Sequence, residues 1–390
     1  MVKPFRLARV PQVIFRSGAL ADLPSTAAAF GRSILLVTGA KSFSSSRRAE
    51  VLLEKLHEHG LSVHHVPISG EPSPAMIDDA SARFRDAGID LVAGIGGGSV
   101  MDAGKAVSAM LKAEGSVTDY LEIVGNREHP GVKVPFIAIP TTSGTGSEAT
   151  KNAVISQVGK DGFKRSLRHE NFVPDLALID PELTLGCPPE ITAAAGMDCF
   201  TQLAEAFLST KACEVTDSLA MQGLMAIKRS LVRSFTNGDD IGARSDMSFA
   251  ALMSGICLAN AGLGAVHGLA GTVGAFYQVP HGVVCGTLMA KANEINVRIL
   301  RKRSDGQSFL RKYAVLGRLF ADAESKSDRY YEVFLIDYLH AVTYRLKLLL
   351  LGRFGLGKDD IPGIVSRSDV KNNPVKLSDE ELAEIILGRL

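Results

Sequence analysis

One carboxylate and two imidazoles in the second half of the chain could bind a divalent metal ion. His267 and His281 flank an apolar, glycine-rich stretch, and His281 lies in the turn Pro280–Gly282. Asp198 lies in a helical pattern, where Gln202, four residues later, shares its face. This donor set suits Fe²⁺ or Zn²⁺ with an open position, from which the ion could polarise an alcohol or carbonyl oxygen. Asp198 could instead cap a helix, so the metal site is a hypothesis at this point.

Two loops in the first half have the chemistry of a nucleotide-binding site. The segment Gly96–Lys105 follows an apolar strand pattern and opens a helix. Its leading glycines let backbone N–H groups approach an anion, and the helix N-terminus adds a favourable dipole. The segment Thr141–Glu148, rich in hydroxyl groups and glycine, follows the next strand pattern and suits pyrophosphate and ribose hydroxyls. The simpler alternative is a glycine-rich turn with a surface pair between Asp102 and Lys105.

The elements that must position these residues differ between the two halves of the chain. In the first half, apolar strand patterns alternate with helical patterns, which predicts right-handed parallel crossovers and a doubly wound sheet. The strand patterns cover residues 34–39, 61–66, 89–95 and 134–139, and the helical patterns cover residues 47–59 and 74–88. From Pro189 onward, long helical patterns dominate and strand patterns are almost absent.

We therefore expect an α/β protein with two domains. An N-terminal nucleotide-binding domain with the doubly wound parallel sheet should span residues 1–186, and an all-helical domain that binds metal and substrate should span residues 187–390. The boundary falls in the turn-rich segment Leu183–Pro188. Because ligands of open α/β sheets bind at the carboxyl ends of the strands, we expect the active site in the cleft between the domains.

The composition argues against several other classes of protein. Lys+Arg 43 and Asp+Glu 42 leave a net charge of +1, so there is no basic surplus for nucleic acid. Hydrophobic residues make up 46% of the chain, which argues against disorder. The five cysteines are scattered without a C-x-x-C pair, which argues against disulfides and a cysteine-rich zinc site. The aliphatic run Leu348–Leu351 is far shorter than the ~20 residues of a membrane span, so we expect a cytoplasmic protein without membrane or nucleic-acid partners.

Motifs along essentially the whole chain resemble those of the iron-containing (group III) alcohol dehydrogenase family. Gly96–Lys105 matches the family signature G-G-G-S-x-x-D-x-x-K, and Thr141–Glu148 matches its second nucleotide loop. The other motifs follow in the family's order, as Val173-Pro174-Asp175, Ile179-Asp180-Pro181, Gly196-Met197-Asp198, Pro280-His281-Gly282 and Asn372-Asn373-Pro374. The resemblance implies a metal-dependent alcohol dehydrogenase or aldehyde reductase, which transfers a hydride between a small alcohol or carbonyl substrate and NAD(P). It also implies a homodimer with the strand around Gln12–Phe15 at its interface.

The resemblance also assigns metal ligands and catalytic residues. The family pattern is an aspartate, a histidine four residues later and two further histidines, and the corresponding residues are Asp198, Gln202, His267 and His281. Gln202 departs from this pattern, because a neutral amide oxygen is a weaker ligand than imidazole. Gly271 also departs, since many members have another active-site histidine there, and a bound water or the cofactor ribose hydroxyl must then carry the proton. We expect Fe²⁺, with Zn²⁺ as the alternative, and catalysis by Asp198, His267 and His281.

The expected cofactor site combines the two loops, the end of the first strand and Lys164, which matches a family lysine near the cofactor ribose. Its residues are Gly39, Lys41, Gly96, Gly97, Gly98, Ser99, Asp102, Thr141, Thr142, Thr145 and Lys164. Many family members have an aspartate at the position of Gly39, and such a carboxylate repels a 2′-phosphate. Lys41 could donate a charge-assisted hydrogen bond to that phosphate, unless the segment is only a solvated turn. We therefore expect NADP(H) to be accepted at least as well as NAD(H).

Two other functions stay open at this point. A lyase resembling dehydroquinate synthase would share the fold and use its nicotinamide transiently. It needs a densely polar pocket, however, whereas the helical half is rich in Leu, Met, Ala and Phe. The departures at Gln202 and Gly271 also suggest a non-catalytic family member that binds the cofactor as a scaffold. The intact Asp198, His267 and His281 and the two loops favour the dehydrogenase.

Overall fold

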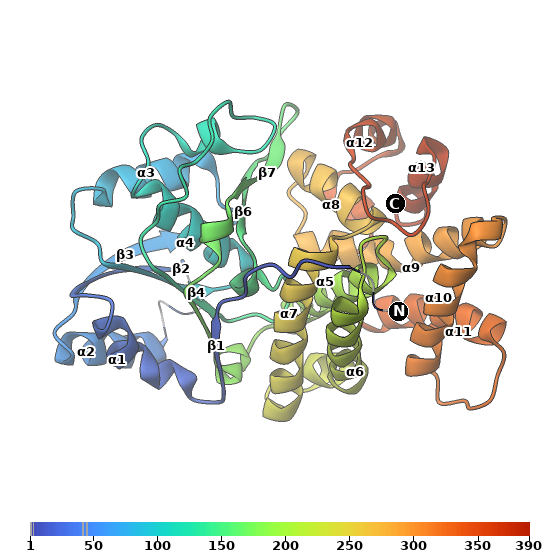
Figure 1. The fold of residues 1–390 in the computed structure, drawn as a ribbon, viewed down its shortest axis with the longest axis horizontal. Helices are drawn as coiled ribbons and strands as arrows, with labels where there is room; N and C mark the ends of the chain where they lie inside the picture. Colours follow the sequence, from blue (N-terminus) through green and yellow to red (C-terminus); the bar gives the residue numbers. More distant parts are fainter. Residues whose placement is uncertain (1, 3, 41–42, 44–45) are drawn as a thin grey trace. The chain divides into compact units, whose positions relative to one another are not determined.

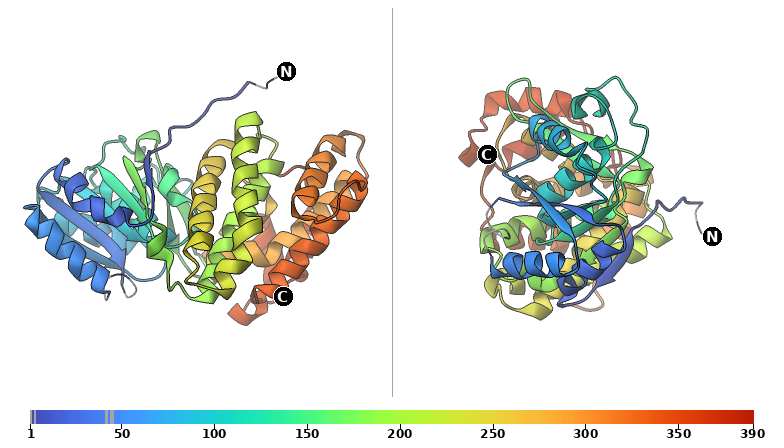
Figure 2. Two further views of the ribbon diagram at one scale, coloured as in Figure 1. Left: turned by 90° about the horizontal axis from the view of Figure 1, so that it is seen from below. Right: turned by 90° about the vertical axis from the view of Figure 1, so that its left-hand side faces the viewer.

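The computed structural model describes residues 2, 4–40, 43 and 46–390, and the chain divides into two compact units. The sheet unit comprises Ala8–Gln157 and Gly162–Leu185. The helical unit comprises Met1–Leu7, Val158–Asp161 and Gly186–Leu390, so it includes two short segments from the first half of the chain. Figures 1 and 2 show most of the sheet unit in blue to green and most of the helical unit in yellow-green to red.

The sheet unit contains a six-stranded parallel sheet in the order β1-β8-β5-β4-β2-β3 (Figure 1). Its strands are β1 Gln12–Phe15, β2 Ser33–Gly39, β3 Ser62–Ile68, β4 Leu91–Gly96, β5 Phe136–Pro140 and β8 Leu176–Ile179. A separate antiparallel hairpin consists of β6 Asn152–Gln157 and β7 Phe163–Arg168. Because β3 lies on one side of β2, whereas β4 and β5 follow on the other, the direction of strand addition reverses beside β4. In open α/β sheets, such a reversal marks the place where ligands bind.

Helices cover both faces of this sheet, which confirms the predicted doubly wound α/β fold. They are α1 Leu23–Ala28, α2 Arg47–Glu58, α3 Pro74–Phe84 and α4 Gly98–Met110. In β2, Leu35 and Val37 join an apolar core with residues of α3 and α4, whereas Ile34 and Leu36 join a second core with residues of α1 and α2. Successive side chains of a strand point to opposite faces, so an unbroken apolar run is buried on both sides.

The helical unit is built around the long helix α5. Its helices are α5 Pro189–Leu208, α6 Glu214–Thr236, α7 Ile241–Ala261, α8 Ala265–Phe276, α9 His281–Leu300, α10 Gln307–Phe320, α11 Asp328–Arg345, α12 Ile361–Arg367 and α13 Asp379–Leu387. α5 packs against α6, α7 and α9, and α8 packs against α9 and α12. Residues 196–208 of α5 are all buried. Any polar side chain in this stretch must therefore find its partners inside the protein.

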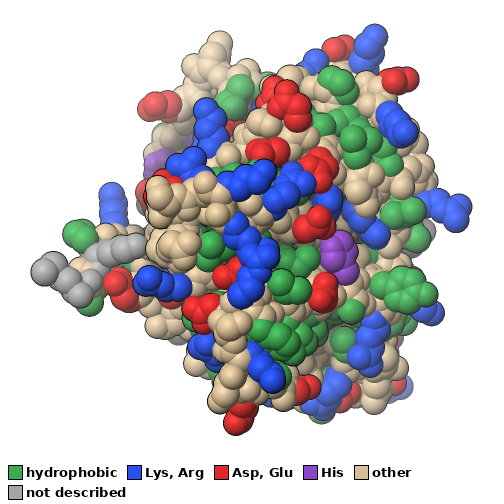
Figure 3. All heavy atoms as spheres, turned by 90° about the vertical axis from the view of Figure 1, so that its right-hand side faces the viewer, with side chains coloured by type: hydrophobic (Ala, Val, Ile, Leu, Met, Phe, Trp, Pro, Cys, Tyr) green, Lys and Arg blue, Asp and Glu red, His purple; other side chains and the backbone are tan. Residues whose placement is uncertain are grey.

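The surface and the cysteines bear on the classes of protein considered above. Figure 3 shows the face over α10 and α11, where basic and acidic side chains are interspersed rather than gathered by sign. All five cysteines are free thiols. Among the described residues, no single helix has the length and apolar character of a membrane span. In the part of the chain that the structure describes, α7 and α8 reach that threshold only when taken together, and they meet at a bend of 99°.

Candidate functional site

Asp198 lies in the middle of α5, so it does not cap the helix. Its side chain is 2% exposed. A carboxylate this deeply buried needs charged or hydrogen-bonding partners. Gln202, one helical turn later, donates from Nε2 to Asp198 Oδ2 at 3.4 Å. The helix-cap alternative is therefore wrong, and the two residues form a buried polar pair on one face of α5.

The two histidines converge on Asp198 from two other helices. His267 lies in the first turn of α8, and its Nε2 lies 3.3 Å from Asp198 Oδ1. His281 is the first residue of α9, and its Nε2 lies 3.8 Å from the same oxygen. The helical unit thus brings Asp198, Gln202, His267 and His281 together, although their assignment as metal ligands stays a prediction.

A glycine contact allows the start of α9 to reach α5. A Cβ atom on Gly282 would lie 2.2 Å from the carbonyl oxygen of Ala194, in the backbone of α5. This distance is far shorter than van der Waals contact, so any larger residue would push the two helices apart. Because Gly282 directly follows His281, this close approach holds the imidazole beside Asp198.

Cys285 is a further donor at the cluster, and the sequence analysis missed it. Its Sγ lies 3.5 Å from Nε2 of both His267 and His281, and its side chain is fully buried. With Asp198 and the two histidines, it forms a group whose donor atoms all lie within 4.8 Å of one another. Cys285 follows His281 by four residues on α9, so helical spacing was the signal that could have revealed it.

Glu205 is a second residue that the sequence analysis gave no role, and it orients His267. Its Oε2 lies 2.7 Å from His267 Nδ1, and its Oε1 accepts from the N–H of Val266 at 2.7 Å. A carboxylate on one ring nitrogen selects the tautomer and directs the other nitrogen at the site, as in many metal centres. Asn373 supports the same helix, because its Oδ1 accepts from the N–H of Ala265 at 3.2 Å.

Burial and mutual charge control protonation within this cluster. Burial raises the pKa of Asp198, but the charge on His281 and the hydrogen bond from His267 outweigh this effect and bring the pKa to about 2. Burial lowers the pKa of His267, yet its interactions with Cys285, Asp198 and Glu205 raise that pKa well above the usual value. Burial raises the pKa of the Cys285 thiol to about 12. At neutral pH the metal-free cluster therefore contains an ionised Asp198, and the raised pKa of His267 favours the imidazolium that balances it.

The donor set fits a divalent metal ion. Gln202 Oε1 is buried and has no hydrogen-bond partner among the described residues. Buried polar atoms without a partner are rare in proteins, and an orphaned acceptor beside a carboxylate suits a cation or a water bound to one. Carboxylate, imidazole and thiolate groups are all ligands of Zn²⁺ and of iron.

In the sheet unit, the two predicted nucleotide loops meet at the carboxyl ends of β4 and β5. Gly96 pairs with Pro140 across the sheet, and the N–H of Thr141 donates to the Gly96 carbonyl at 2.8 Å. Both loops therefore begin at the carboxyl ends of interior strands, and β4 borders the place where the direction of strand addition reverses, which is where doubly wound proteins bind nucleotides.

Close packing between the two loops explains the consecutive glycines. A Cβ atom on Gly98 would lie 2.7 Å from the Thr145 side chain, and one on Gly97 would lie 3.2 Å from Thr142 Oγ1. α4 begins after Gly97 without a side-chain cap. The first N–H groups of a helix, here including that of Ser99, lack intrahelical acceptors, and their use as an anion site stays a prediction.

Asp102 and Lys105 form a buried network, so the surface-pair alternative is wrong. Lys105 is fully buried, and its Nζ donates to oxygens of Ser147, Thr150 and Asn152 at distances between 2.7 and 3.2 Å. Asp102 Oδ1 accepts from Ser147 Oγ at 2.5 Å. Burial lowers the pKa of Lys105 to about 8, although nearby carboxylates oppose the shift. Lys105 ties α4 to the segment that follows the second loop.

The other predicted cofactor residues lie on separate elements. Gly39 ends β2, and the preceding Thr38 pairs with Ile95 near the end of β4. Lys164 lies on β7, where its Nζ lies 3.0 Å from Glu71 Oε2. Lys41 lies outside the described residues. Nucleotide binding by these residues stays a prediction.

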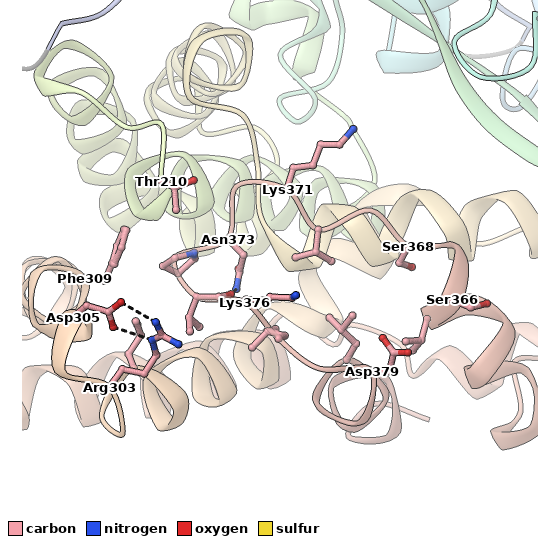
Figure 4. Close-up of a pocket in the computed structure, with 17 residues that line it drawn as sticks. Thr210, Arg303, Asp305, Phe309, Ser366, Ser368, Lys371, Asn373, Lys376 and Asp379 are labelled. Carbon is pink, nitrogen blue, oxygen red and sulfur yellow. Dashed lines mark hydrogen bonds and ion pairs between the residues drawn. The ribbon is translucent and has the colours of Figure 1, made fainter.

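A cavity of about 760 Å³ lies in the helical unit, away from the predicted site residues (Figure 4). Arg303 and Asp305 pair with each other at one end of it. Among the described residues, none of the predicted metal ligands lines this cavity. Asn373 connects this cavity with the cluster around Asp198. It lines the cavity, and its Oδ1 accepts a hydrogen bond from the N–H of Ala265 at the start of α8.

The fold and the cluster together are typical of oxidoreductases that combine a nicotinamide nucleotide with a divalent metal. The profile of iron-containing alcohol dehydrogenases matches residues 11–181, and the profile of the C-terminal part of the Fe-containing alcohol dehydrogenase family matches residues 192–388. The chain belongs to the iron-containing alcohol dehydrogenase family. It is therefore an NAD(P)- and metal-dependent oxidoreductase, which confirms the predicted family, activity and cofactor classes.

Individual relatives agree with this membership and do not support the lyase. Long-chain-alcohol dehydrogenase 1 of Geobacillus thermodenitrificans is 36% identical over 266 residues, which are 68% of this chain and 67% of that protein. The crystal structure of a 1,3-propanediol oxidoreductase has a TM-score of 0.88 at 27% identity and covers 100% of both chains. Sulfoacetaldehyde reductase from Bifidobacterium kashiwanohense, solved with NAD⁺, has a TM-score of 0.85 at 25% identity and covers 99% of both.

Proposed function

We propose that Asp198, His267 and His281, with Gln202 beside them, hold the catalytic metal of an alcohol dehydrogenase that acts on small alcohols and aldehydes. The observation that carries this proposal is the convergence of one carboxylate and two imidazoles from α5, α8 and α9. Both Nε2 atoms lie near a single Asp198 oxygen, at 3.3 and 3.8 Å. When bound, a divalent metal supplies Lewis acidity toward an alcohol or carbonyl oxygen. We propose Fe²⁺, with Zn²⁺ as the alternative.

The side chains of the cluster contribute to metal binding in different ways. Asp198 contributes a negative charge, and its pKa of about 2 keeps it ionised at neutral pH. Glu205 holds the Nδ1 side of His267, so a neutral imidazole presents the lone pair of Nε2 to the site. Gly271 has no side chain to accept a proton. The proton that leaves a substrate hydroxyl therefore passes to a water or to the ribose hydroxyl of the cofactor.

Replacement of His281 by alanine tests the metal assignment. We expect His281→Ala to lose metal affinity by about 10–100-fold or more and to lose alcohol oxidation with it. His340→Ala is the matched control, because His340 is half exposed on α11 and pairs with Glu294. Metal analysis and reduced-nicotinamide absorbance measure the two effects. Full retention of both by His281→Ala would contradict the assignment.

We also propose that the enzyme accepts NADP(H) at least as well as NAD(H). Gly39 ends β2 and has no carboxylate to repel a 2′-phosphate. A charge-assisted hydrogen bond from Lys41 would add about 1.5–3 kcal/mol, which corresponds to about tenfold to a hundredfold in affinity.

The variant Gly39→Asp tests this preference. We expect it to shift the ratio of kcat/KM values toward NAD(H), because the new carboxylate repels the 2′-phosphate and accepts from the adenosine ribose. Lys41→Ala should weaken NADP(H) while leaving NAD(H) nearly unchanged. If the unmodified enzyme strongly prefers NAD(H), and Gly39→Asp leaves the ratio unchanged, the proposal is wrong.

A homodimer that pairs through β1 is a further part of the proposal. β1 is an edge strand, which pairs only with β8 among the described strands, and Val13 is 38% exposed. An edge strand offers N–H and C=O groups to another chain, whereas a charged side chain there discourages pairing. Sedimentation at micromolar concentration should show a dimer that Val13→Lys weakens. A monomeric unmodified protein would rule this out.

We place the enzyme in the cytoplasm. Its five cysteines are all free, and unpaired thiols persist in reducing compartments. Protein denatured and alkylated at the moment of cell lysis should carry five alkyl groups, one on each cysteine. A disulfide recovered under those conditions would argue for another compartment.

A further inference from the structure

Cys285 lies in the same cluster of side chains as Asp198, His267 and His281. We propose that its thiolate is the fourth protein ligand of the metal, alongside Asp198, His267 and His281. The inference rests on the proposed metal-dependent function. It gives to Cys285 the strong-ligand role that Gln202, as a neutral amide, fills poorly.

Three of the separations between donor atoms match the edges of a tetrahedral site. Bonds of about 2.3 Å to sulfur and about 2.0–2.1 Å to nitrogen place these two atoms about 3.5 Å apart around a tetrahedral ion. Cys285 Sγ lies 3.5 Å from both imidazole Nε2 atoms. Bonds of about 2 Å to oxygen and nitrogen give an edge of about 3.3 Å. His267 Nε2 lies 3.3 Å from Asp198 Oδ1, and the edge from His281 is longer, at 3.8 Å.

A metal ion would satisfy the sulfur and both imidazoles with a single partner. Without one, the thiol can donate to one imidazole nitrogen and accept from the other, and Sγ lies 3.5 Å from both. Glu205 occupies the Nδ1 side of His267, so Nε2 carries the lone pair once the ring is neutral, as a metal ligand must be. One cation between the four donors would satisfy the sulfur, both nitrogens and the carboxylate oxygen together.

The sulfur is also held in place by the packing of α9. His281 and Cys285 lie one helical turn apart on the same face. A glycine follows each of them, and both glycines press against α5. A Cβ on Gly282 would lie 2.2 Å from Ala194 O, and one on Gly286 would lie 2.6 Å from Met197 Cβ. The two donors on α9 are thus fixed by the same pair of contacts that fixes α9 on α5.

Coordination by Cys285 has a defined chemical balance and a consequence for metal choice. A metal–sulfur bond forms as the S–H bond breaks, the proton leaves to the buffer, and no electrons are transferred. Two anionic and two neutral ligands then compensate the charge of a divalent ion. Because thiolate is a softer donor than imidazole or an amide oxygen, coordination by Cys285 would reverse the proposed choice of Fe²⁺ and favour Zn²⁺ and its substitute Co²⁺.

Cobalt substitution of the full-length apoenzyme tests the ligand directly. Co²⁺ bound by a thiolate gives an intense charge-transfer band in the near ultraviolet, whereas nitrogen and oxygen ligands do not. We expect this band in the unmodified protein and in Cys257→Ser, and we expect its loss in Cys285→Ser. Cys257 is the matched control, because it is equally buried and its thiol donates to the Thr216 carbonyl, as a serine hydroxyl can.

Competition with a chelator measures the contribution of each ligand. Cys285→Ser should weaken Zn²⁺ binding by about 100-fold, and Gln202→Leu should weaken it by less than about tenfold. The preference for Zn²⁺ over Fe²⁺ should fall in Cys285→Ser and persist in Gln202→Leu. Far-ultraviolet circular dichroism checks that each variant folds, and the spectrum of the unmodified protein decides the question even if Cys285→Ser does not.

The outcomes separate this inference from the proposed function. An unmodified enzyme that binds Co²⁺ and oxidises alcohols, but shows no charge-transfer band, overturns the role of Cys285 and leaves the metal site intact. A larger loss of affinity in Gln202→Leu than in Cys285→Ser also overturns it. An unmodified protein that binds neither Co²⁺ nor Zn²⁺ overturns both the inference and the proposed function.

Discussion

Lys105 Nζ donates to four oxygens in a fully buried setting, with the carboxylates of Asp102 and Glu148 close enough to affect its pKa. Lys105 belongs to the segment predicted to bind the nucleotide, but the contacts of its ammonium group are with oxygens of the protein. A buried cation with this many partners stabilises one geometry of the chain around it. Single residues of a motif can therefore serve the scaffold of a site rather than its ligand.

Glu148 makes this buried network sensitive to pH. Its side chain is 3% exposed, and burial raises its pKa from 4.5 to about 7, although its own backbone N–H and Lys105 oppose the shift. The folded protein therefore holds a proton that the unfolded chain releases between pH 4.5 and pH 7. The stabilisation is complete below the unfolded pKa and is lost as the pH rises through the folded value.

We expect Glu148→Gln to remove this dependence. Relative to the unmodified protein, the free energy of unfolding of the variant should rise between pH 5 and pH 8, by up to about 3 kcal/mol. Urea unfolding across this range measures the difference, and Glu58→Gln, an exposed change on α2, is the control. Parallel pH profiles for Glu148→Gln and the unmodified protein would contradict the prediction.

Helices α8 and α9 show how glycines set the distances between elements. Gly282 and Gly286 lie where a Cβ would collide with α5, whereas a Cβ on Gly271, in α8, would meet no described atom within 4 Å. The first two glycines are therefore required by packing. Gly271 is not, and it costs helix stability because of its greater freedom in the unfolded chain.

We expect alanine to have opposite effects at these positions. Gly271→Ala should stabilise the protein by about 0.5–1 kcal/mol, because it removes a helix-interior glycine without a clash. Gly282→Ala should destabilise it by about 1–3 kcal/mol, since α9 must move away from α5, and should lower the metal content with it. Urea unfolding and metal analysis measure both. Equal stability of the two variants would show that the contact with Ala194 is not needed.

Some residues of the site could be predicted from the sequence, and others could be found only from the packing of the helices. Asp198 and Gln202 share a helical face, and His267 and His281 flank an apolar, glycine-rich stretch, so the sequence and its family resemblance were enough to select them. Cys285 and Glu205 reach the site only because α9 and α8 pack against α5. No local sequence pattern predicts that packing. Glu205 lies on α5, on the same face as Asp198 and Gln202, but its partner His267 is 62 residues away in the sequence.

For the whole molecule, the alternation of strand and helix patterns was enough to predict the doubly wound sheet, because local periodicity determines it. The pairing of β1 with β8 joins Gln12 to Leu176, and no short-range signal indicates such a distant partner. Likewise, residues 158–161 lie between two strands of the sheet unit but belong to the helical unit, where Gly159 N–H donates to Ala275 O at 3.1 Å. Long-range contacts of this kind could not be predicted.

Metal removal should affect the two units differently. All the proposed ligands belong to the helical unit, and a ligand stabilises only the structure that binds it. We expect a chelator to increase amide hydrogen exchange in α5, α8 and α9, with little change in β2, β4 and β5. Readdition of Zn²⁺ should reverse the effect. A uniform increase over both units would show that they unfold as one cooperative structure.

The order of the ligands along the chain has a consequence for biosynthesis. The segments of the sheet unit end at Leu185, before Asp198 and well before His281 and Cys285. During translation, this unit can fold on the ribosome while the metal site does not yet exist. Because α9 carries two of the proposed ligands, His281 and Cys285, we expect the metal to be loaded only after that helix has emerged and docked on α5. Metal insertion would then be a late maturation step, open to competition between the divalent ions that are abundant at that point.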